Sequence, residues 1–274
     1  MTTSIRTNTS AMLALQNLNR TNDQLASTQT RVSTGLKVQG AKDNAAVWAV
    51  AQGQRADRGS LEAVTTSLKR ATTIADVSLA AGAQISDILV ELKQKATAAA
   101  DPSATAAMRT SYNDEYQSLL KSIQSFADNA TFDGANILDA SATTALSFLA
   151  SADASETISL GRQDLTLTGL SLTGTSLTSD TNASAALTAV NTAIATSSAR
   201  LAELGSQAKQ IERHTTYVGK LSDALEAGIG NLVDADMPKE SARLTALQVQ
   251  QQLGVQALSI ANQSPQIILS LFKN

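Results

Sequence analysis

The chain has 274 residues, enough for one or two domains, and 43% of them are hydrophobic whereas only 3% are aromatic. It has no cysteine and a single histidine, His214, which excludes disulfides, thiolate metal sites and cysteine nucleophiles and argues against imidazole metal centres and serine–histidine–aspartate catalysis. The formal net charge of −3 leaves no basic surplus to neutralise phosphates, so we expect no nucleic-acid partner. Small aliphatic residues favour long, closely packed helices over a bulky globule.

The first periodic segment lies near the N-terminus. Apolar or small residues recur there at alternating steps of three and four, a heptad pattern that predicts a helix packed in a coiled coil. The positions are Ala11, Ala14, Leu18, Thr21, Leu25, Thr28 and Val32. Gly35 and Gly40 interrupt the pattern, and Asp43 or Asn44 is placed to cap the next helix.

Two longer heptad seams follow. One runs from Leu61 to Leu92, and the other keeps its alternation from Leu187 to Leu232, a span of 46 residues or roughly 70 Å of helix. Between them we expect a shorter helix whose apolar face consists of Met108, Tyr112, Leu119, Ile123 and Phe126. The fold class is therefore mainly α, an elongated antiparallel helical rod or coiled-coil bundle.

Residues 131–181 lack helical periodicity and are rich in Thr, Ser, Gly and Asp. Alternation at period two predicts short strands or hairpins. The pairs are Leu146/Phe148, Ile158/Leu160, Leu165/Leu167 and Leu170/Leu172, with a bulge expected at Gly169. We expect this small β-hairpin region at the far tip of the helical hairpin.

The C-terminal segment carries two apolar seams on different faces and has no charged residue between Leu244 and Phe272. One seam is Ala246, Leu253, Ala257, Ile260, Ser264, Ile267 and Leu271; the other is Leu244, Leu247, Gln251, Gly254, Leu258, Ala261 and Ile268. Such a helix has no face suited to solvent. The N-terminal helix can cover only part of it, so we expect other copies of the chain to cover the rest. The alternative is a helix in the middle of a monomeric bundle.

The many amides of the C-terminal segment argue against a membrane span. No cleavable secretory signal is visible at the N-terminus.

Several polar and aromatic residues have a structural and a functional interpretation. A polar residue at a seam position, here Asn8, Asn22, Gln29 or Gln251, fixes the register of packed helices, although each of these amides could equally well just solvate the helix surface. We interpret Trp48 as a packing anchor and His214 as a solvated surface residue.

Proline and acidic residues mark the last helix. We interpret Asp234 and Asp236 as capping and connector residues rather than a metal site or an acid–base dyad, with Asp236 as N-cap and Pro238 in the first turn. Pro265 lies inside this helix, where we expect a modest kink rather than an end.

Four stretches resemble the bacterial flagellins. Residues 5–18 are similar to the opening helix of that family, and residues 32–46 (VSTGLKVQGAKDNAA) resemble its signature. Residues 230–237 (GNLVDADM) with 239–242 (KESA) resemble its C-terminal hinge. Residues 251–258 (QQLGVQAL) and 264–271 (SPQIILSL) resemble its last helix, and the length suits the short flagellins of alphaproteobacteria.

The resemblance implies a division into terminal helices that form the inner layer of a filament (1–33 and 241–274), hinges (34–42 and 233–240) and an outer rod domain (43–232). We assign assembly in the inner core to the apolar residues Ile5, Leu15, Leu18, Leu25, Leu253, Leu258, Ile260, Ile267 and Leu271. The hinge and signature residues are Gly35, Lys42, Asp43, Asn231, Asp234 and Asp236.

The resemblance also implies a function and its partners. The protein would be a structural subunit, not an enzyme, that assembles into the extracellular flagellar filament for swimming. Its partners would be other copies of itself and other flagellins, the flagellar export apparatus with an export chaperone, and the hook-associated and cap proteins. No cofactor, nucleic acid or membrane insertion is expected. The ends would be disordered in the free subunit and fold on assembly.

Two other interpretations remain open at this point. A flagellin-like hook–filament junction protein would share the terminal motifs but polymerise poorly alone. A soluble coiled-coil adaptor would have stable helical ends in the dilute monomer.

Overall fold

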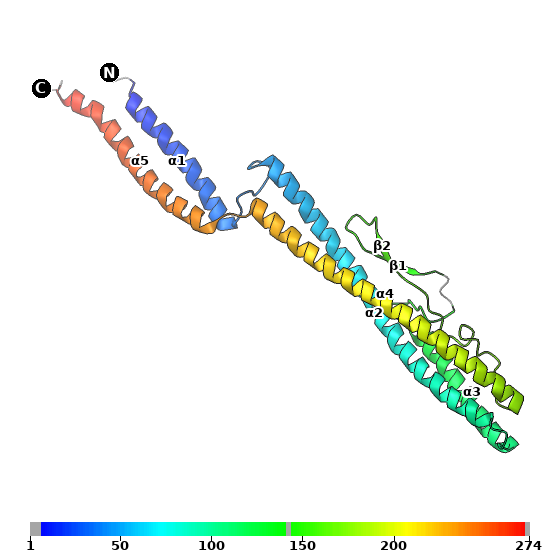
Figure 1. Cartoon of the computed structure of the whole chain (residues 1–274). Helices are drawn as coiled ribbons and strands as arrows, with labels where there is room; N and C mark the ends of the chain where they lie inside the picture. Colours follow the sequence, from blue (N-terminus) through cyan, green and yellow to red (C-terminus); the bar gives the residue numbers. More distant parts are fainter. Residues whose placement is uncertain (1–6, 141–143, 272–274) are drawn as a thin grey trace. The chain divides into compact units, whose positions relative to one another are not determined.

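We describe the protein from a computed structural model, which describes residues 7–140 and 144–271, with the backbone alone for 264–271. The elements are α1 (Thr9–Thr34), α2 (Ala45–Ala99), α3 (Ala106–Asn129), β1 (Leu146–Leu149), β2 (Thr157–Leu160), α4 (Asp180–Val233) and α5 (Met237–Leu271) (Figure 1). The chain divides into two compact units, residues 1–55 with 225–274 and residues 56–224, so that α2 and α4 each contribute to both. The chain is mainly α, as predicted.

In the unit of residues 56–224, α2 and α4 pack against each other in opposite directions. All ten seam positions predicted for α2 are buried; they are Leu61, Val64, Leu68, Ala71, Ala75, Ser78, Gly82, Ile85, Leu89 and Leu92. The seam of α4 is buried or half-buried at each of its fourteen positions, which are Leu187, Val190, Ile194, Ser197, Leu201, Leu204, Ala208, Ile211, Thr215, Val218, Ser222, Leu225, Ile229 and Leu232. Gly82 of α2 contacts Leu201 of α4 so closely that a Cβ at this position would overlap the leucine side chain. The heptad pattern therefore identified both helices and their buried faces correctly.

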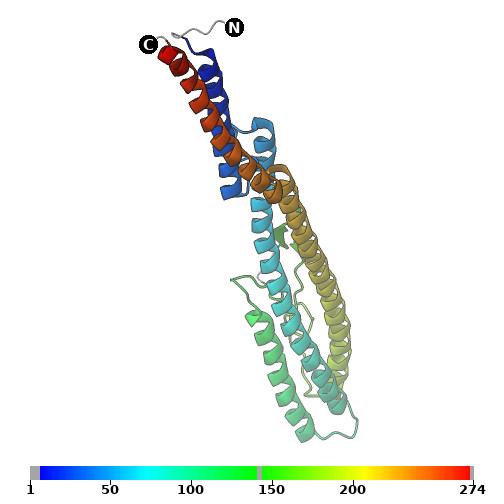
Figure 2. The same cartoon turned by 90° about the vertical axis from the view of Figure 1, so that its left-hand side faces the viewer.

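The third helix of this unit, α3, lies alongside α2 (Figure 2) and is linked to it by an ion pair between Lys95 and Glu115. The predicted apolar face of α3 was only partly right. Ile123 is buried, but Met108 and Phe126 are 46% and 39% exposed. The buried face consists of Tyr116, Leu120, Ile123 and Ala127. The small residue Ala127 is buried where the larger Phe126 was expected.

The strands β1 and β2 form an antiparallel pair in which Phe148 lies opposite Ile158. Their turn is organised by Asp153, whose carboxylate accepts hydrogen bonds from the hydroxyls of Ser151 and Ser155, and these bonds lower its pKa to about 2. The backbone N–H of Leu149 donates to Ser67 Oγ of α2 (3.1 Å), well before the end of α2 at Ala99. The hairpin thus lies along the middle of the helices, and its expected position at the tip was wrong.

The other two expected strands, around Leu165 and Leu170, are turns. Leu165, Leu170 and Leu172 are buried, but the backbone closes on itself, with the N–H of Leu170 donating to Thr166 O (2.9 Å). The Arg200 guanidinium of α4 binds the carbonyl oxygens of Asp164 and Gly169 and so clamps this segment. The period-two alternation reflected anchoring of leucines in the core rather than strand pairing.

A window of 18 residues within α2 has a mean hydropathy of 1.3, enough by length and composition for a membrane span, and a third of the window is buried. The sequence had raised a membrane span only for the C-terminal segment, where the many amides argue against it. The buried seam of α2 packs within its own unit, so the apolar character of the helix is accounted for by the protein core.

Candidate functional site: the terminal helices

In the unit of residues 1–55 and 225–274, α1 and α5 lie side by side (Figures 1 and 2). The face of α1 toward α5 is the predicted heptad seam, with Thr21 and Thr28 buried and the five other positions half-buried. The face of α5 toward α1 belongs to the second predicted seam, with Leu247 buried and Leu244, Gln251, Gly254, Leu258 and Ala261 half-buried. At the closest approach, a Cβ on Gly254 would stand 3.2 Å from Leu18 Cδ1.

Amide side chains connect the two helices across this face. Gln251 Nε2 donates to Asn22 Oδ1 (2.8 Å), and Asn8 Nδ2 donates to the carbonyl oxygen of Ala261 (2.7 Å). Three of the four predicted register residues therefore do contact the partner helix, whereas Gln29 is exposed. Because each amide has its partner at one relative position only, these bonds favour a single register of α1 on α5.

One polar contact of this pair was not predicted. Arg31 Nη1 lies 3.4 Å from Glu240 Oε1, and the Glu240 side chain is only 11% exposed. Glu240 Oε2 is buried without a hydrogen-bond partner. No sequence pattern indicates this ion pair, because the two residues are 209 positions apart and Glu240 was assigned to a hinge.

The two connectors are hydrogen-bonded to each other. Gly35 ends α1 in the left-handed conformation (φ 73°), and its carbonyl accepts from the N–H of Ala235 (2.8 Å). The carbonyl of Val233 accepts from the N–H groups of Lys37 (2.7 Å) and Val38 (3.3 Å). A glycine is needed at position 35, since other residues adopt this conformation only with strain. The signature and C-terminal hinge motifs thus form one joined structure.

Side chains complete this junction. Asn44 caps α2 through Val47 N (3.1 Å), whereas Asp43 accepts from the N–H groups of Gln39 and Gly40. Trp48 is half-buried against a cluster of Val38, Ala51, Ile229 and Val233, as its interpretation as a packing anchor predicted.

The other residues predicted for the hinges make few contacts of their own or are exposed. Asp236 caps α5 through the N–H of Lys239 (3.2 Å), as predicted, and Asp234 forms a β-bridge with Leu36. Lys42 and Asn231 are exposed. Among the described residues, no group of three or more potential ligands could hold a metal ion.

The terminal helices expose a second set of apolar residues. On α5 the outer seam, which we define as Ala246, Leu253, Ala257 and Ile260, faces away from α1, with Leu253 59% and Ile260 69% exposed. On α1, Met12, Leu13 and Leu15 are 64%, 60% and 47% exposed.

The predicted assembly residues therefore fall into two groups. Leu18, Leu25 and Leu258 pack between the two helices, whereas Leu15, Leu253 and Ile260 are exposed. Ile5 and the side chains of Ile267 and Leu271 lie outside the described residues. Residues 237–271 form one helix, so the chain continues as helix through Pro265.

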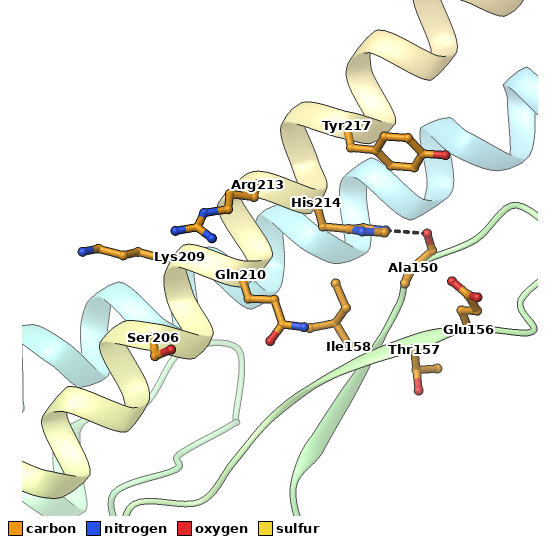
Figure 3. Close-up of a pocket in the computed structure, with 10 residues that line it drawn as sticks. All are labelled: Ala150, Glu156, Thr157, Ile158, Ser206, Lys209, Gln210, Arg213, His214 and Tyr217. Carbon is orange, nitrogen blue, oxygen red and sulfur yellow. Dashed lines mark hydrogen bonds between the residues drawn. The ribbon is translucent and has the colours of Figure 1, made fainter.

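An open groove of about 800 Å³ lies between the β-hairpin and α4 (Figure 3). His214 Nε2 lies 2.7 Å from the carbonyl oxygen of Ala150 at its floor, and the His214 ring is 5.7 Å from that of Tyr217. The expectation of a merely solvated histidine was wrong, because the hairpin folds back over α4 and brings this carbonyl to the ring. Lys209 and Arg213 also line the groove, and their charged ends point away from the hairpin (Figure 3).

Comparison with known proteins identifies the family. A model of the bacterial flagellin N-terminal helical region matches residues 5–143, and one of the bacterial flagellin C-terminal helical region matches residues 187–272. The chain belongs to the bacterial flagellin family. This flagellin is 50% identical to flagellin FljM of Caulobacter vibrioides over 98% of both chains, and 40% identical to a flagellin of Brucella melitensis over 98% of this chain and 99% of the relative.

The fold agrees with this family. The crystal structure of Bacillus cereus flagellin superimposes with a TM-score of 0.51 at 25% identity, covering 56% of this chain and 88% of that one. The sequence-based assignment to an alphaproteobacterial-type flagellin is confirmed. The protein is accordingly a structural subunit of the extracellular flagellar filament.

Proposed function

We propose that this flagellin assembles through the outer faces of its terminal helices, which pack against α1 and α5 of other copies in the inner layer of the filament. The observation that carries this proposal is the exposed outer seam of α5, in a helix segment that has no charged residue after Arg243. Exposed leucine and isoleucine side chains without neighbouring charges mark a surface that is covered in the working protein.

The amount of apolar surface supports the same partner. Burying a large aliphatic side chain contributes about 1.5–3 kcal/mol, so Leu253 and Ile260 together offer several kcal/mol per subunit on assembly. An identical copy offers a surface of the same chemistry, and a contact between two different faces of identical subunits propagates into a helical polymer when it does not close into a ring. We therefore infer self-assembly, including mixed filaments with related flagellins, rather than a site for a small ligand.

The remaining partners follow from membership of the family. We infer that the chain is carried by the flagellar export apparatus with an export chaperone, and that in the filament it meets hook-associated and cap proteins. We infer no enzymatic activity, since the site consists of helix-packing residues. The division into terminal helices, hinges and rod at residues 34–42 and 233–240 belongs to the same proposal.

The test is a pair of substitutions on the outer seam. In Leu253→Glu/Ile260→Glu, each filament contact would bury a carboxylate without a partner, and we expect no filaments by electron microscopy. The free subunit should keep its helix content in circular dichroism, because both positions are exposed there. Leu253→Met/Ile260→Met keeps the apolar character and should form normal filaments.

Normal polymerisation of the glutamate variant would show that the outer seam is not an assembly surface. Spontaneous filaments of the wild-type protein without seeds would set it apart from a hook–filament junction protein, which needs an existing filament end. A wild-type protein that never polymerises would overturn the proposed function itself.

A further inference from the structure

Two exposed stripes of opposite charge lie on the two long helices, α2 and α4, of the unit of residues 56–224. The acidic stripe consists of Asp76, Asp87 and Glu91 on α2, and the basic stripe of Lys209, Arg213 and Lys220 on α4; all six are exposed. Among the described residues, none of the six has an oppositely charged group within 4 Å, and Glu91 interacts electrostatically with Lys95 one turn further along α2. The residues of each stripe share one helix face, because they are 4, 7, 11 or 15 positions apart. All of them are exposed, so this face lies on the side of the helix away from the buried seam.

The stripes match in spacing. Asp76 and Asp87 are eleven residues apart on α2, as are Lys209 and Lys220 on α4, which corresponds to about 16 Å along each helix. Between the two aspartates this face of α2 carries the exposed small residues Ala80 and Ala83, which leave room for a neighbouring helix. Glu212 and Asp223 lie about 60° around α4 from the basic stripe, on one flank of it.

We propose that the acidic stripe of one subunit docks on the basic stripe of a neighbouring subunit, with Asp76 facing Lys220 and Asp87 facing Lys209. The proposal rests on the function in filament assembly and names a second contact surface for it, independent of α1 and α5. Subunits that point the same way bring α2 of one beside α4 of the next in antiparallel orientation, since the two helices are antiparallel within each unit.

The stripes of one subunit lie at different heights. Ser67 and His214 bind the adjacent hairpin residues Leu149 and Ala150, so they mark the same level on α2 and α4. Counting from that level, Asp76 stands beside Gly205 of its own chain. In the proposed contact it faces Lys220 of the neighbour, fifteen residues further along, so neighbouring subunits are displaced by about 22 Å along the helix axis.

Such a contact joins two different faces with an axial displacement, so it does not close into a ring and is compatible with a helical polymer. Charge pairs at exposed positions act mainly on the rate and selectivity of association. We therefore expect the stripes to govern how fast and in which register a subunit is added, whereas the apolar terminal helices hold it.

The test is charge reversal with rescue. Lys209→Glu/Lys220→Glu and Asp76→Lys/Asp87→Lys each place like charges in the contact, and we expect seeded elongation at low salt to slow roughly tenfold in both. The fourfold variant that combines them restores opposite charges and should elongate at nearly the wild-type rate. High salt should narrow the differences, because it screens exposed charges.

The matched control is Lys93→Glu/Lys121→Glu, which makes the same change in net charge at two exposed lysines of the same unit that lie outside the stripes. Elongation of this control at the wild-type rate supports the proposal. Equal slowing of the control, absence of any effect in the stripe variants, or a fourfold variant as slow as its parents would each overturn it. All rates are compared with seeded elongation of the wild-type subunit. If the wild type elongates and the stripe variants behave as the proposal excludes, assembly through the terminal helices still stands.

Discussion

At the scale of single residues, the segment around Gly169 shows how closely the loops are fitted to the helices. A Cβ at Gly169 would stand 2.5 Å from Asp164 Cγ and would overlap the Asp164 carbonyl oxygen, which Arg200 binds together with the carbonyl oxygen of Gly169. Gly205, in contrast, lies inside α4, where a methyl group on its Cα would have no atom of another part of the chain within 4 Å.

We expect Gly169→Ala to lower the free energy of unfolding by about 1–3 kcal/mol, because backbone must shift to admit the methyl group. Gly205→Ala should raise it by about 0.5–1 kcal/mol, since alanine loses less backbone entropy in a helix. Urea unfolding followed by circular dichroism measures both. A stabilising Gly169→Ala would contradict the packing described for this turn.

The sequence identified some residues and missed others for a physical reason. Capping follows local rules that involve neighbours three residues away. The sequence predicted Asp236 as the cap of α5 and offered Asp43 or Asn44 for α2, of which Asn44 is the cap. The Arg31–Glu240 ion pair, the Arg200 clamp and the contact of His214 with Ala150 depend on segments brought together by folding. Sequence periodicity contains no information about tertiary contacts of this kind.

At the scale of elements, the pair α1–α5 is specified by amides as well as by apolar contacts. Gln251 donates a hydrogen bond to Asn22 across the helix pair, and both residues are half-buried. Loss of one partner leaves the other amide without its hydrogen bond in a partly dry interface, and such a bond contributes about 1 kcal/mol.

We expect Gln251→Ala to raise the critical concentration for polymerisation roughly fivefold, which corresponds to about 1 kcal/mol. Asn22→Ala should have a similar effect, and the double variant should cost clearly less than the two single changes combined. Sedimentation of filaments at several protein concentrations gives these values. Strict additivity would mean that the two amides do not act as a pair.

The heptad pattern predicted the long helices well because their buried seams repeat over many turns, from Leu61 to Leu92 and from Leu187 to Leu232. Periodicity failed for α3 and for the turns around Leu165. A helix of 24 residues offers few repeats, so one large exposed side chain such as Phe126 shifts the apparent face. Leucines that anchor a turn also mimic the alternation of a strand.

At the scale of the whole molecule, the two compact units differ in how their apolar residues are covered. The unit of residues 56–224 buries its seams within itself, whereas α1 and α5 cover each other on one face only. An isolated pair of helices with exposed apolar faces is marginally stable in water. The ends of the free subunit are therefore expected to open far more often than the rod.

Amide hydrogen exchange measures this difference. In the dilute subunit we expect α1 and α5 to exchange much faster than the buried parts of α2 and α4, and in filaments we expect all four helices to be protected. The same measurement on Leu253→Glu/Ile260→Glu should show the pattern of the free subunit at any concentration. Strong protection of α1 and α5 in the dilute wild type would show that the two helices are stable without neighbouring copies.

Trp48, the only tryptophan of the chain, packs at the joined connectors against Val38 and Val233. The fluorescence of an indole ring depends on the polarity around it. Fluorescence excited selectively at tryptophan therefore reports on this junction alone. The protein thus carries its own optical reporter at the joined connectors, and the state of this junction can be followed during assembly without attaching a dye.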